Sequence, residues 1–181
     1  DRAHRMHKAG FLPSLTLDID AARARAAQAL LNATKDGSLR NGPKDDTYDA
    51  SLAQAAILGF PNRDVCESTM QSIARALAVQ NGGKETGFYF RYLRTDDFGR
   101  PQSSFVICSF WVVQGLARLG RMAEAQQIMA QVLTGANHLG LFSEHFVPET
   151  RTQLGNFPQA YSHVGLINAA FAVSPSWTTV L

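Results

Sequence analysis

Two kinds of helical segment alternate along the sequence, and this alternation limits the possible folds more than any other feature. Apolar residues recur at helical spacing and predict helices at residues 18–34, 47–58, 65–80, 101–119, 122–138 and 157–173. The first, third and fifth segments are amphipathic, whereas the second, fourth and sixth are apolar or small on nearly all sides. A helix without a polar face must be covered on most sides, so we expect an inner and an outer layer. No alternating run indicates a strand, and the predicted class is all-α.

The connections between these segments also differ in a regular way. Short connections follow the inner helices, at residues 59–64 and 119–121, whereas long connections lead into them, at 35–46, 81–100 and 139–156. The long loops should therefore gather at one end of the array, beside the N-termini of the inner helices. Loops of that length in a compact domain are usually functional. The loops share no repeated motif, which counts against a peptide-binding solenoid.

Composition excludes several classes of protein. The chain has 181 residues, of which 45% are hydrophobic and 18% charged, so we expect a single domain with a real core rather than a disordered chain or a coiled coil. The formal net charge of +2 and the scattered basic residues give no reason to expect a nucleic-acid partner. No stretch approaches the roughly 20 apolar residues that span a bilayer, so no membrane insertion is expected.

The N-terminal residues and the two cysteines bear on origin and compartment. The first residues lack both an initiator Met and the apolar centre of a signal peptide. We therefore expect an internal part of a longer chain, with a cytoplasmic location favoured. Cys66 and Cys108 lie in apolar helical patterns, where buried free thiols are the usual finding, although the sequence does not exclude a disulfide.

The loop at 81–100 brings an arginine together with aromatic residues. Arg91 lies among Phe88, Tyr89, Phe90 and Tyr92 and is followed by Asp96 and Asp97. Its guanidinium has five fixed donors that suit a hydroxyl-rich ligand, but a structural pair of Arg91 with a carboxylate explains the pattern equally well. Three polar residues precede the second predicted helix, namely Asp46, Thr47 and Asp49. The simplest role for any one of them is to cap the N-terminus of that helix.

The loop at 139–156 holds a carboxylate with a candidate chemical role. Glu144 lies between apolar pairs at 141–142 and 146–147, with His145 beside it. A carboxylate among aromatic side chains can act as a base near neutral pH, but composition alone favours a solvent-facing glutamate that flanks a helix. The spacing of Glu144, His145 and His163 matches no helical pair of metal ligands, so no metal site is expected. The serines lack a G-x-S-x-G motif, which argues against a serine hydrolase.

Four stretches occur together in an order that has a known counterpart. They read, from the N-terminus, "TYDASLAQAAILGF", "FYFRYLRTDD", "SFVICSFWVVQGLARLGRMAEAQ" and "GLFSEHFVPETRTQLGNFPQAYSHVGLINAA". In this order they resemble bacterial glycoside hydrolase family 15, which includes glucoamylase-type, glucodextranase-type and bacterial trehalase-type enzymes. The resemblance spans nearly the whole chain, and its last stretch is long enough to be specific. It implies an (α/α)6 barrel, of which these three αα-hairpins would supply about the C-terminal half, with residues 1–181 forming part of one catalytic domain.

The resemblance also assigns roles to individual residues. It implies that Glu144 is the general base of an inverting hydrolysis of α-glucosidic bonds. The residues implied to bind or surround the sugar are Arg91, Tyr92, Phe105, His145, Gln153 and Tyr161. His145 departs from the pattern, because the family usually has Glu or Gln after its base. No cofactor is implied.

The general acid of the family has no counterpart in this sequence. The chain starts with "DRAHRMHKAG", as though cut just after the acid motif, so we expect the acid to lie upstream. The expected activity is glucoamylase-like hydrolysis of oligosaccharides or polysaccharides by the intact protein. The alternative is a non-catalytic half-barrel that binds carbohydrate or self-associates. Because a half-barrel would expose apolar sides of its inner helices, we expect either a homodimer or a missing N-terminal half as partner.

Overall fold

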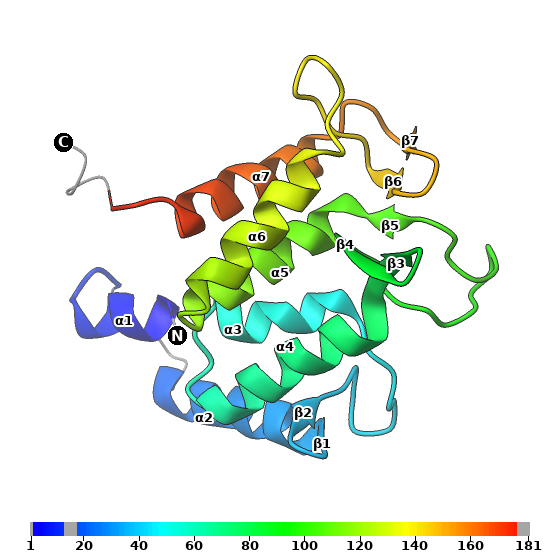
Figure 1. The fold of residues 1–181 in the computed structure, drawn as a ribbon. Coiled ribbons are helices and arrows are strands. Elements are labelled where there is room, and N and C mark those ends of the chain that lie inside the picture. The colour runs from blue at the N-terminus through cyan, green and yellow to red at the C-terminus, as the bar shows by residue number, and fades with distance from the viewer. Residues whose placement is uncertain (1, 13–17, 177–181) are drawn as a thin grey trace.

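The computed structural model describes residues 2–12 and 18–176, and within them the chain is mainly helical (Figure 1). The helices are α1 (Arg2–Lys8), α2 (Ile19–Asn32), α3 (Gln54–Ile57), α4 (Arg63–Leu77), α5 (Val106–Arg118), α6 (Met122–Leu133) and α7 (Ala160–Val173), with a 3-10 turn, η1 (Ala50–Ala53), directly before α3. The strands are β1 (Thr34–Lys35), β2 (Ser38–Leu39), β3 (Ala78–Asn81), β4 (Lys84–Tyr89), β5 (Ser104–Phe105), β6 (His145–Val147) and β7 (Thr152–Leu154). Each of the six predicted helices is present, and α1 is an additional one.

Several helix ends differ from the prediction for local chemical reasons. The segment predicted at 47–58 becomes helical only at Ala50, because the Asp49 carboxylate caps it by accepting a hydrogen bond from the Ser51 N–H at 2.8 Å. Helix α6 ends at Leu133 rather than at 138. Helix α7 begins at Ala160 rather than at 157, because the ring of Pro158 disfavours the helical conformation for the residue before it, Phe157.

The prediction of an all-α chain was wrong in one respect, because the three long loops contain short antiparallel strands. Strand β1 pairs with β2, and β3 pairs with β4. Strands β5, β6 and β7 form a three-stranded sheet in which Phe105 is opposite His145 and Phe146 is opposite Gln153. Five of these strands have only two or three residues and β3 has four, which is too short to show an alternating pattern in the sequence. The six-residue β4, "KETGFY", has no alternation of apolar and polar residues either. The loops are therefore ordered hairpins at one side of the molecule (Figure 1).

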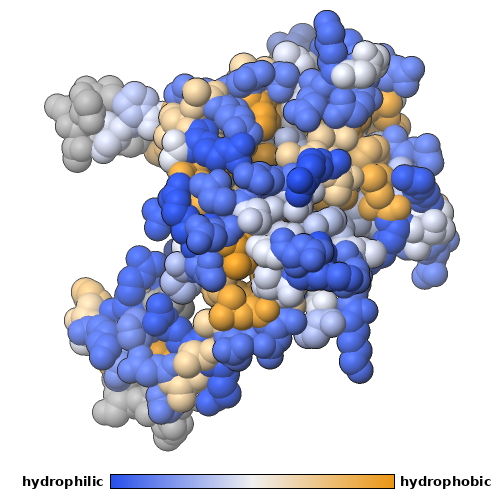
Figure 2. Space-filling model, turned by 60° about the horizontal axis from the view of Figure 1, so that its bottom comes forward, coloured by the Kyte–Doolittle hydropathy of each residue, from blue (hydrophilic) through white to orange (hydrophobic). Residues whose placement is uncertain are grey.

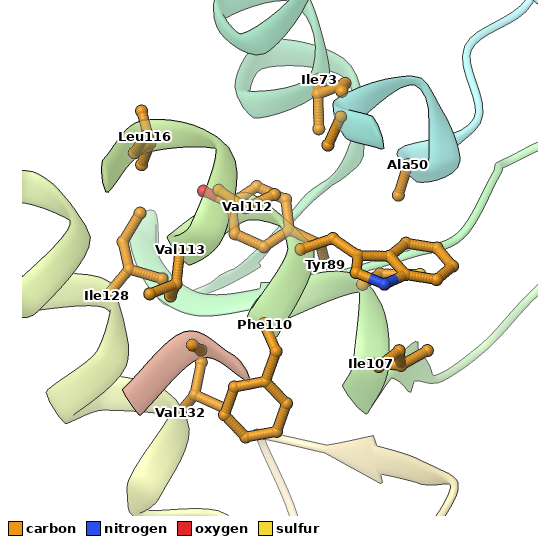
Figure 3. Close-up of a cluster of buried hydrophobic side chains, with 14 of the residues drawn as sticks. Ala50, Ile73, Tyr89, Ile107, Phe110, Val112, Val113, Leu116, Ile128 and Val132 are labelled. Atoms are coloured by element: carbon orange, nitrogen blue, oxygen red, sulfur yellow. The ribbon is translucent and has the colours of Figure 1, made fainter. Parts of the chain in front are cut away.

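Helix α5 is the centre of the core, as expected for an inner helix. All residues from Val106 to Val113 are buried, and α5 packs against α3, α6, α7 and β4. The side chains of Phe110 and Val113 meet Ile128 and Val132 of α6 in this core (Figure 3). The amphipathic helices α4 and α6 each bury one face against it, which confirms that they belong to the outer layer.

Among the described residues, α7 buries only a narrow strip of its surface, although its composition predicted a helix covered on most sides. Its buried residues are the small ones, Ser162, Gly165 and Ala169, which lets α7 lie close to α5. Its large apolar side chains lie largely exposed, namely Tyr161, Val164, Ile167 and Phe171. Further hydrophobic areas lie between hydrophilic ones on the face shown in Figure 2. The arc of helices therefore ends on a hydrophobic helix face.

Both cysteines are buried free thiols, which confirms the expected form of these residues. The Cys66 thiol donates to the Phe60 carbonyl oxygen at 3.8 Å. Burial disfavours the charged thiolate and is the main reason why the pKa of both thiols is raised. The pKa rises further for Cys108, which lies in the first turn of α5.

Candidate functional site

Glu144 is fixed by its backbone to two other parts of the fold. It precedes β6, where its carbonyl oxygen accepts a hydrogen bond from the Val106 N–H at 3.0 Å, at the first residue of α5. Its own N–H donates to the carbonyl oxygen of Asn156 at 2.9 Å, in the connection from β7 to α7. The base predicted from the sequence is thus held between the N-terminal ends of two inner helices.

The Glu144 carboxylate is held at one oxygen. Its Oε2 accepts hydrogen bonds from the Asn156 N–H at 3.2 Å and from Asn156 Nδ2 at 3.1 Å. No hydrogen-bond partner for Oε1 is found in the described parts of the chain, and the residue is half-buried. A carboxylate that is anchored through one oxygen and unpaired at the other can accept a proton from a molecule bound next to it.

Aromatic side chains gather beside Glu144. The His145 ring stacks on Phe105 with a centroid distance of 5.0 Å and an interplanar angle of 19°, and its Nδ1–H donates to the Ser104 carbonyl oxygen at 3.1 Å. Tyr161, which is 47% exposed, meets Phe105 edge-on at 6.5 Å. Three residues predicted from different segments, Phe105, His145 and Tyr161, are therefore brought together on β5, β6 and α7.

Trp111 joins this aromatic group and was not singled out in the sequence. Its ring meets Tyr161 edge-on at 6.1 Å, and only 9% of its surface is exposed. The available signal was its position in an inner helix, less than two turns after Phe105. A tryptophan in an apolar helix is usually read as core, and this one is mostly core.

The Gln153 side chain binds to the backbone of the segment that precedes Glu144. Its Nε2 donates to the carbonyl oxygens of Gly135 at 2.9 Å and Leu141 at 3.3 Å. It therefore ties β7 to the segment that leads from α6 to Glu144, and this donor is already used within the chain.

Arg91 and Tyr92 form a second cluster, near η1. Arg91 Nε donates to Asp49 Oδ2 at 3.2 Å, with the two side chains 48% and 8% exposed. Burial would lower the pKa of the Arg91 guanidinium, but the charge of Asp49 and this hydrogen bond outweigh it and raise that pKa. The Tyr92 hydroxyl donates to Asp96 Oδ2 at 2.5 Å. Arg91 is thus paired with a carboxylate, as one of the two sequence interpretations expected, but the partner is Asp49 rather than Asp96 or Asp97.

The two clusters lie at the same ends of the inner helices. Asp49 caps η1, Phe105 is the N-cap residue of α5 and Gln159 that of α7. Figure 1 shows the long loops that carry these residues on one side of the helical array. No hydrogen bond or ion pair joins Arg91 to Glu144 within residues 2–12 and 18–176.

The described residues contain neither a membrane-spanning helix nor a cluster of metal ligands. No helix there has the length and apolar character needed to cross a bilayer. No group of at least three His, Cys, Asp or Glu side chains in the same ranges is arranged to hold a metal ion.

Solved structures share this fold. A wild-type glycosidase superposes with a TM-score of 0.69 at 20% sequence identity, over 84% of this chain and 43% of that one. A glutamate-to-alanine variant of a glycosidase in complex with glucose matches with the same TM-score and the same coverage. The chain therefore has the fold of part of a helical glycosidase.

Sequence relatives make the class more specific. The model for glycosyl hydrolases family 15 matches residues 119–171. The trehalase of Mycolicibacterium smegmatis is 37% identical over 142 residues, and that of Thermoplasma volcanium is 37% identical over 125 residues. These matches cover 77% and 67% of this chain but only 21% and 19% of the relatives. The chain contains part of a domain like those of glycoside hydrolase family 15, and it spans about a fifth of the length of the curated relatives it matches.

Proposed function

We propose that the intact protein is a glycoside hydrolase that cleaves α-glucosidic bonds with inversion, with Glu144 as its general base. The observation that supports this most is the state of the Glu144 carboxylate, which is held at Oε2 by Asn156 and has no hydrogen-bond partner at Oε1 among the described residues. Its Oε2 and the ring of His145 both lie close to Gly155, and His145 stacks on Phe105, which in turn contacts Tyr161. Aromatic rings next to a carboxylate suit a sugar, which has apolar C–H faces and hydroxyl edges.

The proposed reaction requires one proton to be taken and another to be given. Oε1 of Glu144 accepts a proton from water as the water oxygen forms a bond to the anomeric carbon. The bond from that carbon to the glycosidic oxygen breaks on the opposite face, and the leaving oxygen takes a proton from a general acid. In inverting enzymes the two carboxyl groups are about 6.5–9.5 Å apart, which leaves room for the water.

The general acid in this proposal lies outside the 181 residues. No glutamate of the chain matches the acid motif of the family, and the trehalase relatives are about five times longer than the matched region. Arg91 would contribute by donating from its terminal nitrogens to sugar hydroxyls, because only its Nε is used by Asp49. Tyr92, Gln153 and His145 would shape the pocket around the sugar.

We also propose that the chain forms about half of an (α/α)6 barrel, as one part of a single catalytic domain. Its two edges support this arrangement. One edge is the exposed face of α7. At the other edge, a hollow of about 510 Å³ lies between α2 and the η1–α3 segment, lined mainly by apolar residues such as Ala27, Leu52 and Leu58. Both edges have hydrophobic surface that further helices would cover.

Trehalose is the substrate that we propose first. Relatives with 37% identity are trehalases from a bacterium and an archaeon, and a Sulfolobus acidocaldarius trehalase is 30% identical over 140 residues. The sequence alone led to the expectation of a glucoamylase-like preference for oligosaccharides or polysaccharides. The trehalase relatives favour the α,α-linked disaccharide instead.

A substrate panel tests this proposal. The full-length protein would be incubated with trehalose, maltose and a dextran, and released glucose would be measured. We expect trehalose to have a higher kcat/KM than either glucan substrate. Faster cleavage of maltose would redirect the substrate assignment, and the absence of glucose from every α-glucoside would contradict the proposed function.

A second candidate function, a self-associating half-barrel, is favoured by the exposed face of α7. Val164 and Ile167 on this face are 51% and 54% exposed. We expect the 181-residue chain alone to form dimers or larger species in sedimentation velocity, with the change of Ile167→Glu shifting it toward monomer. The matched change Leu139→Glu, at a loop residue that is 69% exposed, should leave the association unchanged. A well-folded monomer at high concentration would contradict both the expected association and its assignment to α7.

A further inference from the structure

Asn156 makes three hydrogen bonds to Glu144 from a position twelve residues along the chain. Its carbonyl oxygen accepts from the Glu144 N–H at 2.9 Å, and its own N–H and Nδ2 both donate to Glu144 Oε2, at 3.2 and 3.1 Å. The backbone bonds keep the two segments together. The bond from Nδ2 is the only one of the three that depends on the identity of the side chain at 156.

The residue before Asn156 shows how closely this segment approaches the carboxylate. Gly155 has a φ of +75°, and a Cβ atom built on it would lie 2.8 Å from Glu144 Oε2 and 3.3 Å from His145 Cδ2. Real Cβ atoms essentially never come as near as the first of these distances. Only glycine fits here without moving Glu144, so residues 155–156 and the carboxylate form one packed unit.

We propose that Asn156 is the positioning residue of the base, which sets the orientation of the Glu144 carboxylate so that Oε1 faces the attacking water. This inference rests on the proposed function. A glutamate side chain has three rotatable bonds, and two donors on one of its oxygens remove most of that freedom before substrate arrives. A small displacement of a catalytic group can cost about 10²-fold in rate, so orientation by Asn156 should affect turnover rather than binding.

The test compares two variants in the full-length protein, Asn156→Ala and Asn156→Asp, with trehalose or the best substrate of the panel. Alanine keeps the backbone bonds but removes the Nδ2 donor, and aspartate keeps the shape but places a second carboxylate against Oε2. We expect kcat to fall by roughly 10- to 100-fold in N156A and at least as far in N156D, with KM changed by less than about threefold.

A matched control separates positioning from general destabilisation. The Asn62 side chain also makes a hydrogen bond with the backbone: its Oδ1 accepts from the Val65 N–H at 3.1 Å and so caps α4. Asn62→Ala should lower the melting temperature but leave kcat and KM unchanged.

The outcomes distinguish the inference from the function on which it rests. If N156A and N156D behave like N62A, or raise KM without lowering kcat, Asn156 does not position the base. Glu144→Gln would then still be inactive, and the proposed function would stand. If Glu144→Gln is as active as the wild type, the proposed function itself fails.

Discussion

Replacing Glu144 by glutamine should reduce kcat of the full-length protein by about 10²–10⁴-fold while the protein stays folded. Glutamine has nearly the shape of glutamate, and its amide oxygen can still accept from the two donors of Asn156. It cannot take the proton of the attacking water, however. KM should change little, because the substrate contacts proposed for Arg91 and Tyr161 are kept. The measurement is steady-state kinetics on trehalose together with circular dichroism.

The matched control for this change is Glu149→Gln. Glu149 is an exposed residue in the turn between β6 and β7, in the same hairpin as Glu144. It should retain wild-type kcat and KM. Equal losses in the two variants would mean that the hairpin, rather than the Glu144 carboxylate, is responsible for the effect.

Replacing Gly165 by leucine should lower the free energy of unfolding of the chain by about 3 kcal/mol or more. A Cβ atom at this position would lie 2.4 Å from Ile107 Cδ1 and 3.1 Å from Phe110 Cβ. Both neighbours belong to the buried core of α5, with 1% of Ile107 and 0% of Phe110 exposed. Alanine at 165 should cost less, because it adds only the Cβ atom to the contact, while about 1 kcal/mol of helix propensity gained over glycine offsets part of that overlap. Urea denaturation of the chain would measure both values.

Gly42 provides the control for that experiment. It lies in the loop between β2 and η1, and a Cβ atom built on it meets nothing within 4 Å. Gly42→Leu should therefore change the unfolding free energy by no more than about 0.5 kcal/mol. If Gly165→Leu is equally mild, α7 does not lie against α5 as closely as described.

The arrangement of the helices could be predicted from the sequence because burial leaves a simple pattern. The segment at 101–119 is apolar or small on nearly all sides, which predicted an inner helix, and in the structure every residue of α5 from Val106 to Val113 is buried. Helix α7 has the same kind of composition, yet it is buried only through Ser162, Gly165 and Ala169. The hydrophobicity of a helix shows that its surface needs to be buried, but not which parts of the protein bury it. The exposure of Ile167 could therefore not be predicted from the sequence of α7 itself.

The short strands and the environment of Glu144 could not be predicted for a common reason. Composition alone favoured a solvent-facing Glu144, whereas the structure has it half-buried and bound to Asn156. That contact depends on the β6–β7 hairpin, whose strands have three residues each. Strands this short have no readable alternation, and only the family resemblance singled out Glu144.

The pairing of Arg91 illustrates the limit of reading neighbours along the chain. The nearby carboxylates Asp96 and Asp97 were its expected partners, whereas Asp49 pairs with it across 42 positions of sequence. Asp49 was recognised only as a possible N-cap, and it performs both tasks. Contacts between separate hairpins depend on how the helices stack, which local sequence does not specify.

The configuration of the first products tests inversion by this site most directly. The full-length protein would hydrolyse trehalose in an NMR tube, and the anomeric protons would be followed before mutarotation. Inversion at one anomeric carbon yields one β-glucose and one α-glucose from each molecule, so we expect equal initial amounts of the two anomers. Initial release of α-glucose alone would mean retention, and it would contradict the role of Glu144 as the general base of an inverting hydrolysis.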